Sequence, residues 1–146
     1  MTYLTRPVLI LFLLVSVFGC SSSQTMEEQN VSEITPKPGP PAEYAGYTNP
    51  FTGDPNAIVE GEKIYRERCE SCHGEDGRGD GPLAPSLNPK PGSLVEGGFS
   101  DQYLFWRISE GGLMEPFNSV MPAWKMILNE DQIGQIIAFI RSVEVK

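Results

Sequence analysis

The feature that most restricts how this 146-residue chain can fold is the pentapeptide Cys69-Glu70-Ser71-Cys72-His73. It contains the single His of the chain and two of its three Cys residues. Two thiols separated by two residues can each form a thioether to one of the two vinyl groups of a haem, and the adjoining imidazole can then bind the iron. The pentapeptide therefore predicts one haem c, attached through Cys69 and Cys72 and ligated by His73.

Two other interpretations of a Cys-x-x-Cys pair are a structural zinc site and a dithiol redox site. A structural zinc site needs four ligands, and outside the pentapeptide the sequence has no further His and only one further Cys, Cys20. A thioredoxin-type site is expected among alternating strands and helices, a pattern that this sequence lacks. Haem attachment is therefore the preferred interpretation.

The first twenty residues have the pattern of an export signal. Arg6 supplies positive charge, and the apolar run over residues 7–18 is too short to span a bilayer. The run ends just before Cys20 and three Ser residues, which resembles the bacterial lipoprotein signal, where a Cys is lipidated after cleavage. The alternative is ordinary secretory cleavage that leaves Cys20 as a free thiol. We expect residues 1–19 to be a lipoprotein signal peptide and Cys20 to anchor an exported, periplasmic or extracytoplasmic protein to a membrane.

Residues 20–53 are predicted to form the lipid anchor and a flexible tether. The stretch is rich in Ser, Gln, Glu and Pro, and its apolar residues follow no clear period. Such a composition cannot bury enough surface to offset the entropy lost on ordering. Three aromatic residues within it, Tyr44, Tyr47 and Phe51, are expected either to pack onto the domain that follows or to dock on a partner, and packing is preferred.

Apolar residues predict a helix at each end of the remaining segment, residues 54–146. In the first helix, over residues 56–68, Gly61 and Tyr65 share one face. The second helix follows Asn129, which is a good helix cap. Its apolar residues recur at helical spacing and comprise Ile133, Ile136, Ile137, Phe139 and Ile140.

Between these helices lies a Gly- and Pro-rich stretch, residues 74–100, and then a predicted middle helix at residues 101–110. A loop of this length normally counts against a compact domain. A haem removes the objection, because the porphyrin is itself a large apolar core element that a loop can cover.

Residues 54–146 resemble a class I cytochrome c, a small all-α fold with three main helices and loops around one covalently bound haem. The resemblance rests on Cys69-x-x-Cys72-His73, on Met121-Pro122 and on the two terminal helices. It implies that a Gly and an aromatic residue on the first helix let the last helix cross at close range.

The resemblance also implies roles for residues that line the haem. The Pro85 carbonyl would accept the proton of the His73 imidazole, which fixes the tautomer and raises the basicity of the ring. Leu87 would pack on the porphyrin. Two alternatives stay open for Arg107, a hydrogen bond to a haem propionate or a solvated surface position; Trp106 is a second candidate for the propionate.

Met121, in the Met121-Pro122 pair, is the sixth iron ligand that the resemblance implies. A second His ligand within the chain is excluded, because there is only one His. Met114 and an open or exchangeable site are the alternatives. A thioether ligand raises the reduction potential, and two occupied axial positions leave no room for a substrate.

The predicted function is therefore that of a one-electron carrier, not itself an enzyme, in a respiratory chain. Its partners would be redox proteins, with a quinol-oxidising complex as donor and a terminal oxidase or reductase as acceptor. The chain has 19 acidic and 11 basic residues, a balance that argues against nucleic-acid binding and suits a basic partner surface. The alternative is a haem enzyme or a gas or peroxide sensor whose sixth position is open or displaceable.

Overall fold

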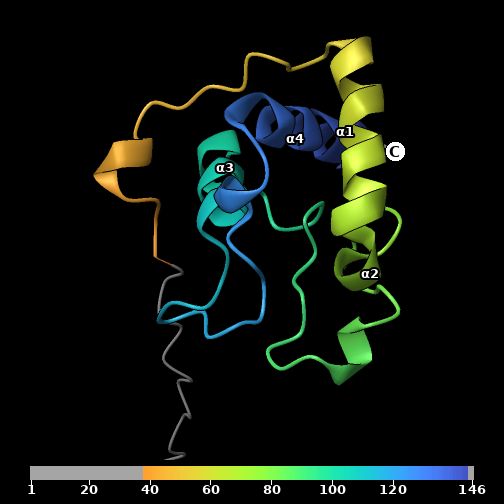
Figure 1. Ribbon diagram of the computed structural model, residues 1–146, viewed down its shortest axis with the longest axis vertical. Helices are drawn as coiled ribbons and strands as arrows, with labels where there is room; N and C mark the ends of the chain where they lie inside the picture. Colours follow the sequence, from red (N-terminus) through yellow and green to blue (C-terminus); the bar gives the residue numbers. More distant parts are fainter. Residues whose placement is uncertain (1–37, 145–146) are drawn as a thin grey trace, which may run out of the picture. The chain divides into compact units, whose positions relative to one another are not determined.

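The protein is seen in a computed structural model that describes residues 38–144. The expectations for residues 1–19 and for Cys20 lie outside this range. Helices are the only regular elements within residues 38–144, as expected for an all-α fold (Figure 1). They are η1 (Ala42–Tyr44), α1 (Pro55–Arg68), α2 (Glu70–His73), η2 (Ala84–Ser86), α3 (Asp101–Glu110), η3 (Trp124–Met126) and α4 (Glu130–Glu144), where η marks a 3-10 helix. None of the helices within residues 38–144 has the length and apolar character needed to cross a membrane.

Side-chain caps set where α1 and α4 begin. The Asp54 carboxylate accepts hydrogen bonds from the backbone N–H groups of Asn56 and Ala57, at 2.9 and 3.4 Å. Asn129 and Gln132 cap α4 reciprocally, because each side-chain oxygen accepts from the backbone N–H of the other residue, at 2.9 and 3.0 Å. These bonds satisfy N–H groups that a helix start otherwise leaves without partners.

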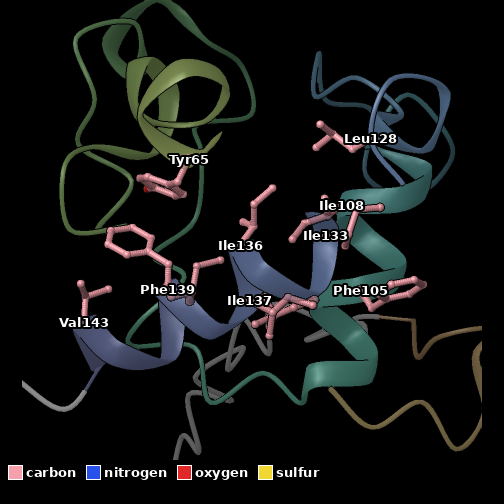
Figure 2. Close-up of a cluster of buried hydrophobic side chains, with 11 residues drawn as sticks. Tyr65, Phe105, Ile108, Leu128, Ile133, Ile136, Ile137, Phe139 and Val143 are labelled. Atoms are coloured by element: carbon pink, nitrogen blue, oxygen red, sulfur yellow. The ribbon is translucent and has the colours of Figure 1, made fainter. Parts of the chain in front are cut away.

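The close crossing of α1 and α4 confirms the expectation for Gly61 and Tyr65. A Cβ atom at Gly61 would lie 1.9 Å from the carbonyl oxygen of Gln135, so only Gly allows the two backbones to approach this closely. The rings of Tyr65 and Phe139 contact each other with centroids 5.0 Å apart. Figure 2 shows these two side chains between the helices that carry them.

Helix α3 completes the core. Ser100 caps its start by accepting a hydrogen bond from the backbone N–H of Tyr103 at 3.1 Å, and Gly111, at φ 70°, follows its last residue. Ile108 lies beside Ile133 of α4 (Figure 2), and Phe105 belongs to the same buried cluster. The predicted bounds of this middle helix, residues 101–110, are confirmed.

The segment before α1, residues 42–51, packs on the helices, and we call it the strap. The Tyr47 ring stacks on that of Phe105 with centroids 4.0 Å apart. The buried Asn49 side chain donates a hydrogen bond to the carbonyl of Gly134 in α4, at 2.9 Å. The preferred expectation that the aromatic residues pack is confirmed for Tyr44 and Tyr47, and the strap belongs to the same compact unit as the helices.

Candidate functional site

The pentapeptide forms the junction between α1 and α2. Cys69 is the residue that ends α1 and precedes α2, and its carbonyl accepts hydrogen bonds from the backbone N–H groups of Cys72 and His73, at 3.1 and 2.9 Å. Residues three and four apart in a helical turn are neighbours on one face. The local fold therefore brings the two thiols and the imidazole together, and both thiols are free.

The environment of the Cys69 thiol differs from that of a reactive dithiol site. Its side chain packs against the apolar core, and this burial, together with the neighbouring Cys72 thiol, raises the pKa of Cys69 to about 12. Reactive dithiol sites have a Cys pKa below the ordinary value, so this environment disfavours the dithiol redox interpretation. Within residues 38–144, no group of three or more His, Cys, Asp or Glu residues could hold a metal ion by itself.

The His73 ring is half-buried, and its Nδ1 atom is buried with no hydrogen-bond partner among the described residues. Burial lowers the pKa of His73, and the backbone of Gly92 partly opposes this shift. The imidazole is therefore neutral at pH 7, and the neutral ring is the form that binds a metal ion.

Residues that follow the pentapeptide fold back onto it. The N–H of Gly79 donates to the carbonyl of His73 at 2.8 Å, and the N–H of Leu83 donates to that of Ser71 at 2.9 Å. A Cβ atom at Gly81 would lie within 2.7 Å of three backbone atoms of the pentapeptide. Gly is thus required at position 81, and the loop is ordered by backbone hydrogen bonds.

Pro85 and Leu87 lie at the end of this folded-back segment. Pro85 is the middle residue of η2 and is exposed, whereas Leu87 is half-buried. No described group bonds to Nδ1 of His73, so the structure lacks the hydrogen bond to the Pro85 carbonyl that the resemblance implies. That bond and the packing of Leu87 on a porphyrin stay predictions.

Met121 is held at the end of a loop closed by two backbone hydrogen bonds. The N–H of Gly112 donates to the carbonyl of Met121 at 2.9 Å, and the N–H of Ser119 donates to the carbonyl of Gly112 at 2.8 Å. A Cβ atom at Gly111 would lie 2.5 Å from the Met121 carbonyl oxygen. Met121 is half-buried and packs against the apolar core, whereas Met114 is 37% exposed and does not join it. Of the two candidate ligands, Met121 is the one that contacts the core, and its role as a ligand stays a prediction.

The charged side chain of Arg107 is partly buried, although the sequence left open whether it lies on a solvated surface. Its guanidinium carbon lies 3.5 Å from the centroid of the Phe117 ring and 5.5 Å from that of Trp106. Its Nη1 atom is buried and has no hydrogen-bond partner among the described residues, and burial lowers the pKa of this guanidinium. These groups fit a haem c. The two free thiols match its vinyl groups, the neutral imidazole matches its iron, and Nη1 of Arg107 matches one of its two carboxylates.

The helices and the Cys-x-x-Cys-His junction define a c-type cytochrome. The sequence model of one family, "Cytochrome C oxidase, cbb3-type, subunit III", matches residues 56–140, which is more than half of the chain. The chain belongs to this family.

Curated relatives carry the names of oxidase subunits. The cbb3-type cytochrome c oxidase subunit FixP of Rhizobium meliloti is 28% identical over 125 residues, which are 80% of this chain and 40% of the relative. FixP of Bradyrhizobium diazoefficiens is 31% identical over 104 residues, 68% of this chain and 33% of the relative. Subunit CcoP of Azospirillum brasilense is 28% identical over 108 residues, 72% and 35%. The chain thus spans between a third and two fifths of the length of these relatives.

Solved structures of similar fold include a cytochrome by name. A chain of the reducing HAO-like protein complex of Kuenenia stuttgartiensis superposes with a TM-score of 0.56 and 26% identity, over 73% of this chain and 51% of that one. Cytochrome cL of Hyphomicrobium denitrificans has a TM-score of 0.50 and 27% identity, over 64% of this chain and 51% of that one. The predicted class I cytochrome c fold is confirmed, and with the family it supports haem-based electron transfer.

Proposed function

We propose that this protein is a one-electron carrier built on a single haem c, which Cys69 and Cys72 would hold covalently and whose iron His73 and Met121 would ligate. The observation that carries the proposal is the junction of α1 and α2, where one helical turn gathers two free thiols and the only His. The half-buried Met121, fastened by its backbone to the residues after α3, supplies the second ligand.

Each residue has a separate task in this proposal. Haem c, when bound, supplies an iron that accepts and releases one electron. Cys69 and Cys72 retain the group covalently, and the neutral imidazole of His73 provides a ring nitrogen to the iron. The Met121 thioether would be the second protein ligand of the iron and would leave it no position for a substrate. Arg107, whose Nη1 has no hydrogen-bond partner within residues 38–144, would balance the charge of a propionate.

Pro85 and Leu87 act on the same site from the loop. With the haem in place, the Pro85 carbonyl would accept a hydrogen bond from the Nδ1–H group of His73, which would orient the ring. This proposal is supported by the buried Nδ1 atom, since a buried N–H normally has an acceptor. Leu87 packs against the porphyrin and limits the access of water.

An absorption measurement tests the ligand set. Ferric protein should show the weak far-red band of an iron–thioether bond, and Met121→Ala should abolish it. Met114→Ala is the matched control and should keep the band, because Met114 is exposed and outside the core. A band that survives in Met121→Ala but disappears in Met114→Ala would assign the ligand to Met114 instead.

The partners follow from the names of the relatives, which are subunits of cbb3-type cytochrome c oxidases. We propose that this chain works in a respiratory chain, receiving electrons from a quinol-oxidising complex and delivering them to a terminal oxidase or reductase. It acts either as a separate carrier or as a subunit of such a complex. The net charge of −8 favours a basic docking surface on the partner, where charge speeds encounter.

The site of action is proposed to be the extracytoplasmic face of a membrane. Residues 1–19 would direct export, Cys20 would be lipidated, and the residues after Cys20 would tether the cytochrome domain. In Cys20→Ser, lipid labelling should be lost and the protein should leave the membrane fraction with an unchanged haem spectrum. Native protein that washes off membranes with salt alone would contradict lipid anchoring.

A further inference from the structure

The carboxylate of Glu110 joins two segments that are distant in sequence. Glu110 is the last residue of α3, and its side chain is 19% exposed. The Tyr44 hydroxyl, on the strap, donates a hydrogen bond to Oε1 of Glu110. The Lys125 ammonium, on η3, lies 2.6 Å from the same oxygen. One carboxylate oxygen of Glu110 therefore accepts hydrogen bonds from a residue that precedes α3 in the sequence and from one that follows it.

This carboxylate lies next to the backbone that holds Met121. Glu110 directly precedes Gly111 and Gly112, and these two residues contact the backbone of Met121 and the residue after it. Lys125 follows Met121 by four residues. The segment that carries Met121 is thus fastened to the end of α3 twice, by a backbone hydrogen bond at Met121 and by an ion pair at Lys125. In Figure 1, η3 lies against α3, in agreement with the contacts between these elements.

The strap is itself packed on the helices, and this supports the contact between Tyr44 and Glu110. Tyr47 stacks on Phe105 of α3, and the buried Asn49 is bonded to the backbone of α4. These contacts hold Tyr44 where its hydroxyl meets Glu110. The hydrogen bonds from Lys125 and then Tyr44 lower the pKa of Glu110, against the effect of its burial, so the carboxylate is charged at neutral pH.

We propose that Tyr44, Glu110 and Lys125 form a latch that keeps Met121 on the iron, with Glu110 as the central positioning residue. Releasing the latch would loosen the segment from Met121 to Lys125 without touching His73 or the thiols. An added ligand that competes with Met121 would then bind more tightly, because less free energy is needed to detach Met121 from the iron. The inference rests on the proposed function, since it requires Met121 to be an iron ligand.

Imidazole added to ferric protein is a suitable probe, because it must displace Met121 to bind, and the far-red band reports the displacement. Tyr44→Phe removes only the hydroxyl and Glu110→Ala removes the whole carboxylate. We expect Glu110→Ala to lower the apparent Kd for imidazole about tenfold, since charged hydrogen bonds are lost, and Tyr44→Phe to lower it severalfold. Lys125→Met should lower this Kd least, because the Lys125 side chain is half exposed and its ion pair is therefore weak.

The matched control is Asp101→Asn, at the other end of α3. The Asp101 carboxylate accepts from Nε of Arg141 at 2.7 Å, so this variant also loses an ion pair on α3, but far along the helix from Gly111 and Met121. We expect its imidazole Kd to equal that of the parent even where its melting temperature falls.

Two results would overturn the latch. Equal shifts in Tyr44→Phe and Asp101→Asn would mean that the effect is general destabilisation. No shift in Glu110→Ala, in a protein where Met121→Ala does raise the imidazole affinity, would refute the latch while leaving Met121 as the ligand. If Met121→Ala also changed nothing, the proposed ligand set itself would fail, and the latch with it.

Discussion

The helix crossing and the loop that carries Met121 are stabilised in different ways. The helical frame that contains the crossing holds the largest fully buried side chains of the described residues, which are carried by α1 and α4: Tyr65, Ile133, Ile136, Ile137 and Ile140. In the loop and the turn after it, Leu113, Val120 and Ile127 are 76%, 60% and 62% exposed. The crossing is held mainly by apolar burial, whereas the loop depends more on backbone hydrogen bonds, the contact of Phe117 with Arg107 and the ion pair at Lys125.

The loop after the pentapeptide resembles the Met121 loop in this respect. Its backbone bonds to the pentapeptide at Gly79 and Leu83, and Leu83 itself is 49% exposed. Side-chain burial therefore stabilises the helical frame more than it stabilises either loop around the candidate site. The comparison teaches that the frame can form from its own sequence, while the loops gain most from a bound haem, which covers apolar surface on binding.

Removing both thiols should have the largest effect and should separate the two regions. In Cys69→Ser/Cys72→Ser, denatured protein should retain no haem, because no thioether can form. Amide hydrogen exchange, measured on the folded variant, should rise more in residues 74–100 than in α1 and α4. Ser71→Ala is the control within the pentapeptide and should keep its haem. Haem that remains attached to the denatured double variant would refute covalent attachment at these residues.

A Val at position 61 tests the crossing directly. Its Cβ would lie 1.9 Å from the Gln135 carbonyl oxygen, so α4 must move, and we expect Gly61→Val to cost about 3 kcal/mol or more of unfolding free energy. Gly92→Ala, where no atom lies within 4 Å of the added Cβ, should melt close to the parent. Denaturant unfolding measures both, and equal stability of the two variants would remove Gly61 from the interface.

Removing the cap of α4 should cost less unfolding free energy than Gly61→Val. In Asn129→Ala the backbone N–H of Gln132 loses its acceptor, and the expected cost is about 1 kcal/mol. The far-red band should not change, because the cap supports the helical frame and not the Met121 loop. A variant that loses the band before it unfolds would show that the two regions are more tightly coupled than we infer.

Much of the frame was predictable from local patterns in the sequence. Apolar spacing predicted α1, α3 and α4, the cap Asn129 predicted where the last begins, and Gly61 with Tyr65 predicted the crossing. These features depend on residues close together in the chain or on one helical face.

The latch and the environment of Arg107 could not be predicted in this way. Tyr44 and Glu110 are separated by 66 positions, and no period or motif links them. Arg107 depends on the ring of Phe117, which a loop of irregular backbone brings over it. The Pro85 contact to His73 came from the resemblance alone and stays a prediction.

The central claim, that both axial positions are filled by residues of this chain, is tested by carbon monoxide binding to the ferrous protein at neutral pH. The native protein should bind carbon monoxide poorly, and Met121→Ala should bind it readily and have a lower reduction potential, because a thioether donor is lost. Met114→Ala should match the native protein in both measurements. Ready binding by the native protein, unchanged in Met121→Ala, would contradict the carrier function and favour a haem enzyme or sensor.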